Sequence, residues 1–159
     1  MGYFTKPGEG SASALEPLTK PRIQAALQAK QWKYDVDSDG DIGGGWEDGF
    51  FYFLPTGKQS EILMVRGTWR GTLTAFEYAK AVETANQWNL DKLWPKVYAR
   101  RTDDGDVRLH CEHVVDYEFG LTDEQLAQHL VTIIATGCEF FEHLNVVFPK
   151  AAAAFKADI

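Results

Sequence analysis

The amino-acid sequence predicts an α+β fold in which helices pack on one antiparallel sheet. Three segments carry apolar residues at three- and four-residue steps, which is typical of amphipathic helices. The segments between them alternate apolar and polar residues, as half-buried strands do. Their connections are short, and because parallel strands need long crossovers, the sheet must be mainly antiparallel. The expected order is helix, strands, helix, two strands, helix.

The first half of the chain supplies a helix and a meander. Thr19 is a good helix cap, and a helix is expected from there to about Gln31, with Pro21 tolerated in the first turn. The period then changes to two, which predicts strands over residues 32–36, 50–54 and 61–67. Turn-forming residues at 55–59 separate the last two of these strands.

A second helix is expected from Thr74 to about Asn89, because Thr74 and Glu77 form a capping box. Its expected buried stripe consists of Phe76, Ala79, Val82 and Trp88. Two strands follow at about Lys96–Arg101 and Asp106–Tyr117, joined by an Asp-Gly turn. On the second of these strands, Cys111 and His113 should share one face, and His110 and Glu112 the other.

The last and longest helix begins at a second capping box, Thr122 with Gln125, and ends near Pro149. Its apolar seam is Leu126, Leu130, Ile133, Gly137, Phe141, Leu144 and Phe148. This pattern fits packing on the chain's own sheet or on a second copy, and the sequence leaves both open.

A chain of 159 residues fits one domain with a core of useful size. Residues 1–17 are rich in Gly, Ser, Pro and Glu and are expected to form a flexible tail. Residues 18–149 are expected to form the single domain, and residues 150–159 a second tail or a frayed helix.

The composition restricts partners and compartment. A formal charge of -7 repels phosphate backbones and anionic membrane surfaces, which disfavours binding to nucleic acid or membrane. Cys111 and Cys138 have no metal-binding or redox spacing, which favours free thiols in a reducing cytoplasm. The first residues lack the apolar core of a signal peptide, and no apolar run approaches the roughly 20 residues that span a membrane.

The segment DVDSDGDIGGGW resembles the start of a calcium loop, with Asp35, Asp37 and Asp39 at the first ligand positions. The twelfth position, however, is Trp46 where a bidentate glutamate is needed, and the flanks are not helical. The Asp-Gly-Asp core therefore predicts a hairpin turn, as it does at residues 104–106, and weak calcium binding by the three aspartates stays open. The Gly43–Gly45 run is expected to form a bulge or a close approach of backbones.

No constellation predicts catalysis or a cofactor. Zinc needs three or four ligands, whereas Cys111 and His113 supply two, and His129 and His143 lie about four helical turns apart. An enzyme using Cys111 with His113 as base is disfavoured, because side chains two apart on a strand point in parallel. The ordinary alternative is that both are half-buried core residues.

Five tryptophans lie at or beside the ends of predicted elements, where they could line a cleft. The candidate partner or ligand surface is Trp46, Arg66, Trp69, Arg70 and Trp94, since an Arg–Trp pair can hold an anion or a planar group. The alternative is core filling by the aromatic rings, with the arginines extending outward.

The chain resembles the YbjN-like domain family, often labelled bacterial sensory transduction regulators, over roughly residues 19–149. The resemblance is carried by the segments DSDGDIGGGWEDGFFYF, ILMVRGTWRG, NQWNLDKLWPKVYAR and DDGDVRLHCEHVVDYEFGLTDEQLAQHL. It implies a fold similar to type III secretion chaperones, with the order helix, three strands, helix, two strands, helix. It further implies a homodimer that holds another polypeptide, and it supplies no catalytic residues.

Two functions follow as expectations. The first is a non-enzymatic protein-binding module, a chaperone-like or adaptor homodimer in a regulatory pathway. The second is a small-ligand sensor in which tryptophans and Arg66 line a pocket for an anionic or aromatic metabolite.

Overall fold

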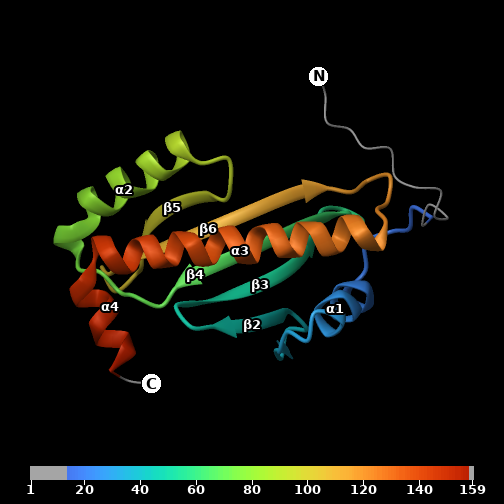
Figure 1. Ribbon diagram of the computed structural model, residues 1–159, viewed down its shortest axis with the longest axis horizontal. Coiled ribbons are helices and arrows are strands. Elements are labelled where there is room, and N and C mark those ends of the chain that lie inside the picture. The colour runs from blue at the N-terminus through green and yellow to red at the C-terminus, as the bar shows by residue number, and fades with distance from the viewer. Residues whose placement is uncertain (1–13, 158–159) are drawn as a thin grey trace.

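The computed structural model describes residues 14–157, which form one six-stranded antiparallel sheet with helices packed on it (Figure 1). The strands are β1 (Asp35–Val36), β2 (Ile42–Trp46), β3 (Gly49–Thr56), β4 (Ile62–Trp69), β5 (Lys96–Arg101) and β6 (Val107–Asp116). The helices are α1 (Lys20–Ala29), the 3-10 turn η1 (Ala75–Glu77), α2 (Tyr78–Asp91), α3 (Asp123–Val147) and α4 (Pro149–Lys156). The strand order is β1-β2-β3-β4-β6-β5, and every pairing is antiparallel, which confirms the predicted fold class.

The helix starts lie where the caps predicted them. The Thr19 hydroxyl accepts a hydrogen bond from the Arg22 amide, and Thr122 and Gln125 form both bonds of a capping box. The tail expected at residues 1–17 lies largely outside the described residues, and within them Glu16 pairs with Leu121 through two backbone hydrogen bonds. At the other end of the chain, α4 occupies the segment after Val147.

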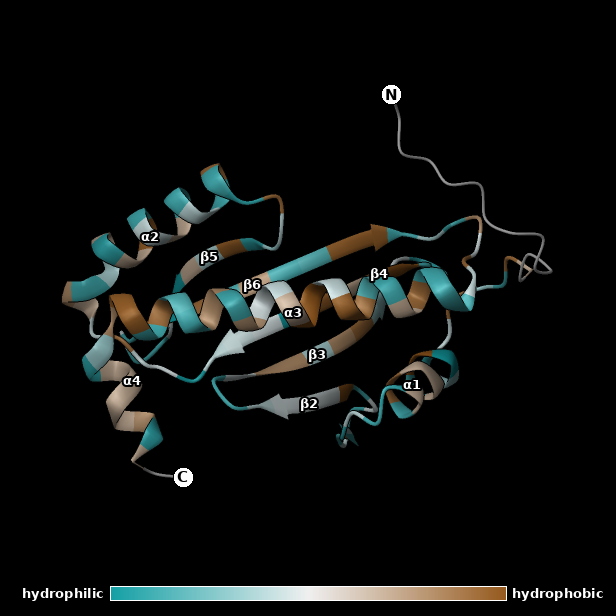
Figure 2. Cartoon of the chain, viewed as in Figure 1, coloured by the Kyte–Doolittle hydropathy of each residue, from teal (hydrophilic) through white to brown (hydrophobic). Residues whose placement is uncertain are grey.

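Helix α3 lies across the middle of the sheet, where Figure 1 shows it in front of β3, β4 and β6. Its apolar seam is buried against these strands, so the seam packs on the chain's own sheet. Gly137 permits the close approach: a Cβ atom there would lie 2.8 Å from Phe51 Cε1. Figure 2 shows hydrophobic residues recurring along α3 and along β3.

By length and composition alone, α3 is long and apolar enough to cross a membrane. The core helix of a folded domain passes the same test, and nine residues of α3, Gly137 among them, are buried in the domain core. Its apolar character is therefore explained by packing on the sheet.

Two expectations about the strands need correction. Gly43–Gly45 form the middle of β2 and pair with Phe50–Tyr52, so the expected bulge is wrong. The alternative of a close backbone approach is confirmed at Gly44, where a Cβ atom would lie 2.9 Å from the Lys33 carbonyl oxygen. The predicted strand at residues 32–36 shrinks to the two-residue β1, since Trp32 is bound into the end of α1 by its amide, which donates to the Leu27 carbonyl. The Asp-Gly turns at 37–41 and 102–106 are confirmed as hairpin turns, with Gly40 and Gly105 at positive φ.

The expected buried stripe of the second helix is also wrong in part. Of its four expected members only Trp88 is buried: Phe76 is 99% exposed, Val82 is 41% exposed and Ala79 is exposed as well. Ala81 and Ala85 are buried with Trp88 instead. The reason is that Phe76 belongs to η1, whose tighter winding ends before α2 begins at Tyr78. The three- and four-residue spacing of the buried face therefore starts at Ala81.

Candidate functional site

The helices of the described residues cover one face of the sheet and leave the other face open. Figure 1 shows α3 in front of the strands, and α1 and α4 contact α3 and contribute to the same core. Helix α2 joins them through the contact of Trp88 with Phe140 of α3. Strand residues that point to the helices, such as Phe51 and Leu63, are fully buried. The strand residues at alternate positions are half-buried to exposed. The exceptions are Thr68 and Glu112, which are buried and hydrogen-bonded to neighbouring side chains.

We call this uncovered side the open face. Its apolar residues are Phe50, Tyr52, Leu54, Ile62, Met64 and Val114. Leu54 lies opposite Met64, and Met64 lies opposite Val114, so these three side chains form one row across three strands. Antiparallel sheets commonly keep a solvated face polar, and an apolar row there is typical of an interaction surface.

A charged network lies beside this row and is centred on Glu112, which is only 6% exposed. Glu112 Oε1 accepts hydrogen bonds from Arg66 Nε at 2.8 Å and from Tyr98 OH at 2.7 Å. Lys96 Nζ lies 2.5 Å from Glu112 Oε2. Burial alone would raise the pKa of Glu112, but the hydrogen bonds from Lys96, Tyr98 and Arg66 outweigh it and lower the pKa to about 2.

The network also changes the titration of Tyr98. Burial and the hydrogen bond to Glu112 raise the pKa of Tyr98 to about 12. Thr68 and His110 lie next in register, with 2.9 Å between Thr68 Oγ1 and His110 Nδ1. Burial, aided by the positive charge of nearby Arg66, lowers the pKa of His110 to about 4. The polar part of the open face is thus held in fixed positions by its own hydrogen bonds.

The structure does not gather the five residues predicted to form a partner or ligand surface. Trp69 has no exposed surface, and its indole Nε1 donates to Asn145 Oδ1 at 3.0 Å, which makes it a core residue. Arg66 lies on the open face within the Glu112 network.

Trp46 and Arg70 lie together at the β2–β3 turn. Arg70 donates to the backbone carbonyls of Trp46 and Glu47, which fixes the turn. The Trp46 ring packs edge-on against Trp32 and Phe51, with centroid distances of 5.9 and 5.1 Å. This pair is therefore engaged in internal contacts, as the alternative of core filling predicted for the tryptophan.

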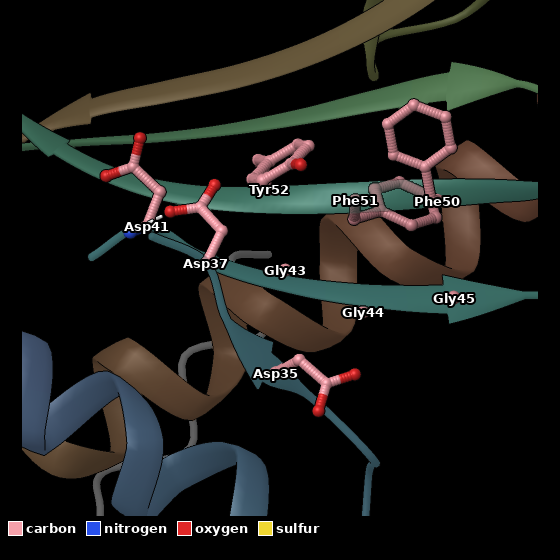
Figure 3. A pocket seen from close by; sticks show the side chains of 9 residues that line it. All are labelled: Asp35, Asp37, Asp41, Gly43, Gly44, Gly45, Phe50, Phe51 and Tyr52. Atoms are coloured by element: carbon pink, nitrogen blue, oxygen red, sulfur yellow. Dashed lines mark hydrogen bonds between the residues drawn. The ribbon is translucent and has the colours of Figure 1, made fainter. Parts of the chain in front are cut away.

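Asp35, Asp37 and Asp41 line a hollow of about 280 Å³ beside Tyr52 (Figure 3). Asp39, the third candidate calcium ligand, is not among its lining residues. Asp37 Oδ1 accepts hydrogen bonds from the amides of Asp39 and Asp41, so this carboxylate closes the turn. Figure 3 shows the Asp35 carboxylate apart from those of Asp37 and Asp41 and pointing away from them. Among residues 14–157, no group of three or more His, Cys, Asp or Glu side chains could hold a metal ion.

Trp94 lines a second hollow, of about 550 Å³, which lies between β6 and α3. We call it the Trp94 hollow; its other lining residues are His113, Tyr117, Glu124, Gln125, Gln128, His129 and Thr132. His113 and His129 meet edge to face, with ring centroids 4.4 Å apart. Sequence spacing did not reveal this pair, because the two residues come from different elements.

Burial sets the charge of both imidazoles. It lowers the pKa of His113 and is the largest cause that lowers the pKa of His129 to about 4. Repulsion between the two rings when both are protonated lowers the pKa of His129 further, whereas a hydrogen bond to the His113 backbone opposes the shift. Both rings are therefore neutral at pH 7.

Cys111 does not have the properties of a nucleophile. It is fully buried, and burial raises the pKa of its thiol to about 12. The thiolate is the reactive form of cysteine, so at pH 7 this side chain is an inert core group.

The fold and the open face define a class of protein: a helix-backed antiparallel sheet whose free face carries an apolar row beside a fixed charge network. The family model for YbjN, described as "Putative bacterial sensory transduction regulator", matches residues 19–145, and the chain belongs to this family. No curated protein matches the sequence significantly.

Among solved structures, the chain is similar to the crystal structure of YbjN from E. coli, described as "a putative transcription regulator". The TM-score is 0.72 at 10% sequence identity, and the match covers 84% of this chain and 96% of that chain. At this identity the likeness shows the shared fold alone.

Proposed function

We propose that this protein is a non-enzymatic protein-binding module, a chaperone-like or adaptor homodimer that engages another polypeptide through the open face. The observation that carries the proposal is the apolar row Leu54–Met64–Val114, which no helix of the described residues covers. Exposed apolar area of this kind gains free energy when a partner removes it from water, by about 25 cal/mol per Å².

The Glu112 network supports a specific partner over indiscriminate sticking. Arg66 and Lys96 keep 39% and 62% of their side chains exposed while one end of each is held by Glu112. Donors fixed before binding lose little conformational entropy on contact with a partner's acceptors. A partner would therefore combine an apolar segment with carbonyl or carboxylate groups beside it.

Regulation by protein contact also agrees with the charge. The E. coli protein is described as "a putative transcription regulator", whereas direct contact of this chain with DNA is opposed by its net charge of -7. Control through another protein avoids that repulsion. The free thiols of Cys111 and Cys138 agree with a reducing compartment such as the cytoplasm.

The test is gentle affinity capture from the native cells, read by native mass spectrometry. We expect a defined polypeptide at fixed stoichiometry on a dimer, lost in Met64→Glu because a carboxylate would be placed within the apolar row. The matched control is Val146→Glu, at a 79% exposed position on α3, which should leave capture unchanged. Equal capture by Met64→Glu and Val146→Glu would exclude the open face as the binding surface. A monomeric mass in the native spectrum would exclude the homodimer.

The second candidate is a small-ligand sensor, and the Trp94 hollow favours it. Its volume of about 550 Å³ is within the usual range for ligand sites, which is about 300–1,000 Å³. Arg66, expected to line the same pocket, lies instead on the open face. A thermal-shift screen with a metabolite panel tests this function, since a ligand of the native state raises the melting temperature.

A further inference from the structure

Positive charge gathers at one end of the open face, although the whole chain has a net charge of -7. Arg100 on β5 lies directly opposite Arg108 on β6, and the alternation of β6 places this pair on the same face as His110. Burial and the positive charges of Arg66, Arg108 and Arg100 lower the pKa of His110 to about 4, so all three guanidinium groups act on this one ring. We call Arg100 and Arg108 the basic end.

No carboxylate neutralises the basic end. The ion pairs of the described residues include neither Arg100 nor Arg108. Arg108 donates instead to the Trp69 carbonyl at 3.1 Å and to the Thr72 hydroxyl at 3.3 Å. Burial lowers the pKa of Arg108, and the charge of Asp106 only opposes this shift. Like charges directly opposite on a sheet are destabilising, so the folded chain keeps this pair at a cost in free energy.

Protection of a sheet edge does not explain the basic end. Charged side chains on an edge strand deter pairing with other chains, and β5 is such a strand. Arg108, however, lies on β6, which has a neighbour on both sides. The edge of β5 is also bonded by α2, because the Asn89 side chain accepts from the Val97 amide and donates to the Val97 carbonyl. An anionic partner on the face explains both arginines.

We propose, on the basis of the protein-binding function above, that the basic end binds an acidic segment of the partner polypeptide. Guanidinium groups bind carboxylates through paired, charge-assisted hydrogen bonds. Arg100 is exposed and Arg108 is half-buried, so carboxylates reach the pair from solvent. Arg66 is held at Glu112 and Arg108 at Trp69, which spreads the positive charge along the strands. This spread fits several carboxylates along a chain better than one small anion.

The open face also sets the spacing of the partner's groups. Val114 of the apolar row and Arg108 of the basic end both lie on β6, six residues apart. At about 3.4 Å per residue this separation is about 20 Å. An extended partner segment spans the same distance with about six residues. The partner therefore combines an apolar cluster with an acidic cluster about six residues away from it.

The first experiment is an NMR titration of the full-length protein with hexaglutamate at low salt, with hexalysine as the probe of opposite charge. We expect hexaglutamate to shift the amide signals around Arg100 and Arg108 and hexalysine to leave them unchanged. Arg100→Glu should weaken hexaglutamate binding by about 3–10-fold, as the loss of exposed ion pairs predicts. Lys150→Glu is the matched control, because it makes the same change of charge at an exposed position on α4.

A single DNA strand of six thymidines tests nucleic acid as the occupant. The proposal is overturned if hexaglutamate binds no better than hexalysine, if Arg100→Glu binds it as well as Lys150→Glu does, or if the DNA strand binds more tightly at equal ionic strength. Loss of the dimer in Arg100→Glu, read by native mass spectrometry, would overturn it as well, because a second copy would then cover the basic end.

Capture of the partner from the native cells separates a failure of the acidic segment from a failure of the protein-binding function. We expect capture to be lost in Arg100→Glu and in Met64→Glu and to be kept in Lys150→Glu. Loss in Met64→Glu alone would overturn the acidic segment and leave the protein-binding function in place. Capture by Met64→Glu at the level of the wild type would overturn that function itself.

Discussion

Substitution of Glu112 by Gln tests the charge network of the open face, because it keeps the side chain's shape and removes its charge. In the wild type, Glu112 accepts hydrogen bonds from Arg66 and Tyr98 and pairs with Lys96. Hydrogen bonds to a charged group contribute about 1.5–3 kcal/mol and neutral ones about 0.5–1.5 kcal/mol, so the change weakens each cationic contact by about 1 kcal/mol. Since Arg66 and Lys96 are partly exposed and can rehydrate, we expect a total loss of about 1–2 kcal/mol in the free energy of unfolding.

The loss should depend on pH in a defined direction. The pKa of Glu112 is about 2 in the folded chain, below its ordinary value of 4.5. Between these pH values the unfolded state binds a proton that the folded state does not. The contribution of Glu112 to the free energy of unfolding is therefore complete above about pH 5 and is lost as the pH falls towards 2. The stability difference between wild type and Glu112→Gln should therefore shrink with falling pH.

Urea unfolding of both proteins at pH 7 and pH 3 measures this difference, with the exposed Glu118→Gln as control. At pH 7 we also expect a melting temperature lower by about 2–8 °C for Glu112→Gln, given about 2–4 °C per kcal/mol in a chain of this size. A gap of equal size at both pH values would refute the reasoning, as would a loss at pH 7 no larger than that of Glu118→Gln.

Three further predictions concern single residues. Spectroscopic titration of the wild type against Tyr98→Phe should show Tyr98 ionising near pH 12. The contribution of Tyr98 to the free energy of unfolding should be lost as the pH rises from about 10 to 12, and ionisation near pH 10 would contradict the network. Thiol-labelling rates at pH 8 should show Cys111 reacting only after unfolding, because it is buried and its pKa is raised to about 12. In urea unfolding, Gly137→Ala should destabilise the chain by about 1–3 kcal/mol, since its Cβ atom would lie 2.8 Å from Phe51. The control is Gly105→Ala, where the new Cβ meets no atom within 4 Å and only the roughly 1–2 kcal/mol of a strained positive φ is lost.

The sequence predicted the helices and most strands because their signals are local. The capping boxes at Thr74 and Thr122 and the Asp-Gly turns satisfy backbone groups within a few residues, and each lies where it was expected. Strand β2 was missed because Gly43–Gly45 have no side chains to show a period of two. Its pairing is specified from outside by the neighbouring β3, where Phe50–Tyr52 form the opposite half of the ladder.

The candidate site was harder to predict because it depends on contacts between distant segments. The strand was expected to end at residue 67, so its alternation was not extended to Trp69. Strand β4 continues to Trp69, and the three-residue spacing then sends Trp69 into the core and Arg66 to the open face. Glu112 and Arg66 are 46 residues apart, and only the β4–β6 register brings them together. The period of β6 did correctly separate Cys111 and His113 from His110 and Glu112.

That separation keeps the two candidate functional surfaces, the open face and the Trp94 hollow, independent of each other. Glu112 and His113 are neighbours in sequence, yet the alternation of β6 places Glu112 with Arg66 on the open face and His113 with His129 beside α3. We therefore expect Met64→Glu to abolish partner capture and His113→Ala to leave it unchanged. Loss of capture in a folded His113→Ala variant would contradict this separation, because it would show that the Trp94 hollow acts on the open face through β6, the strand that contributes to both.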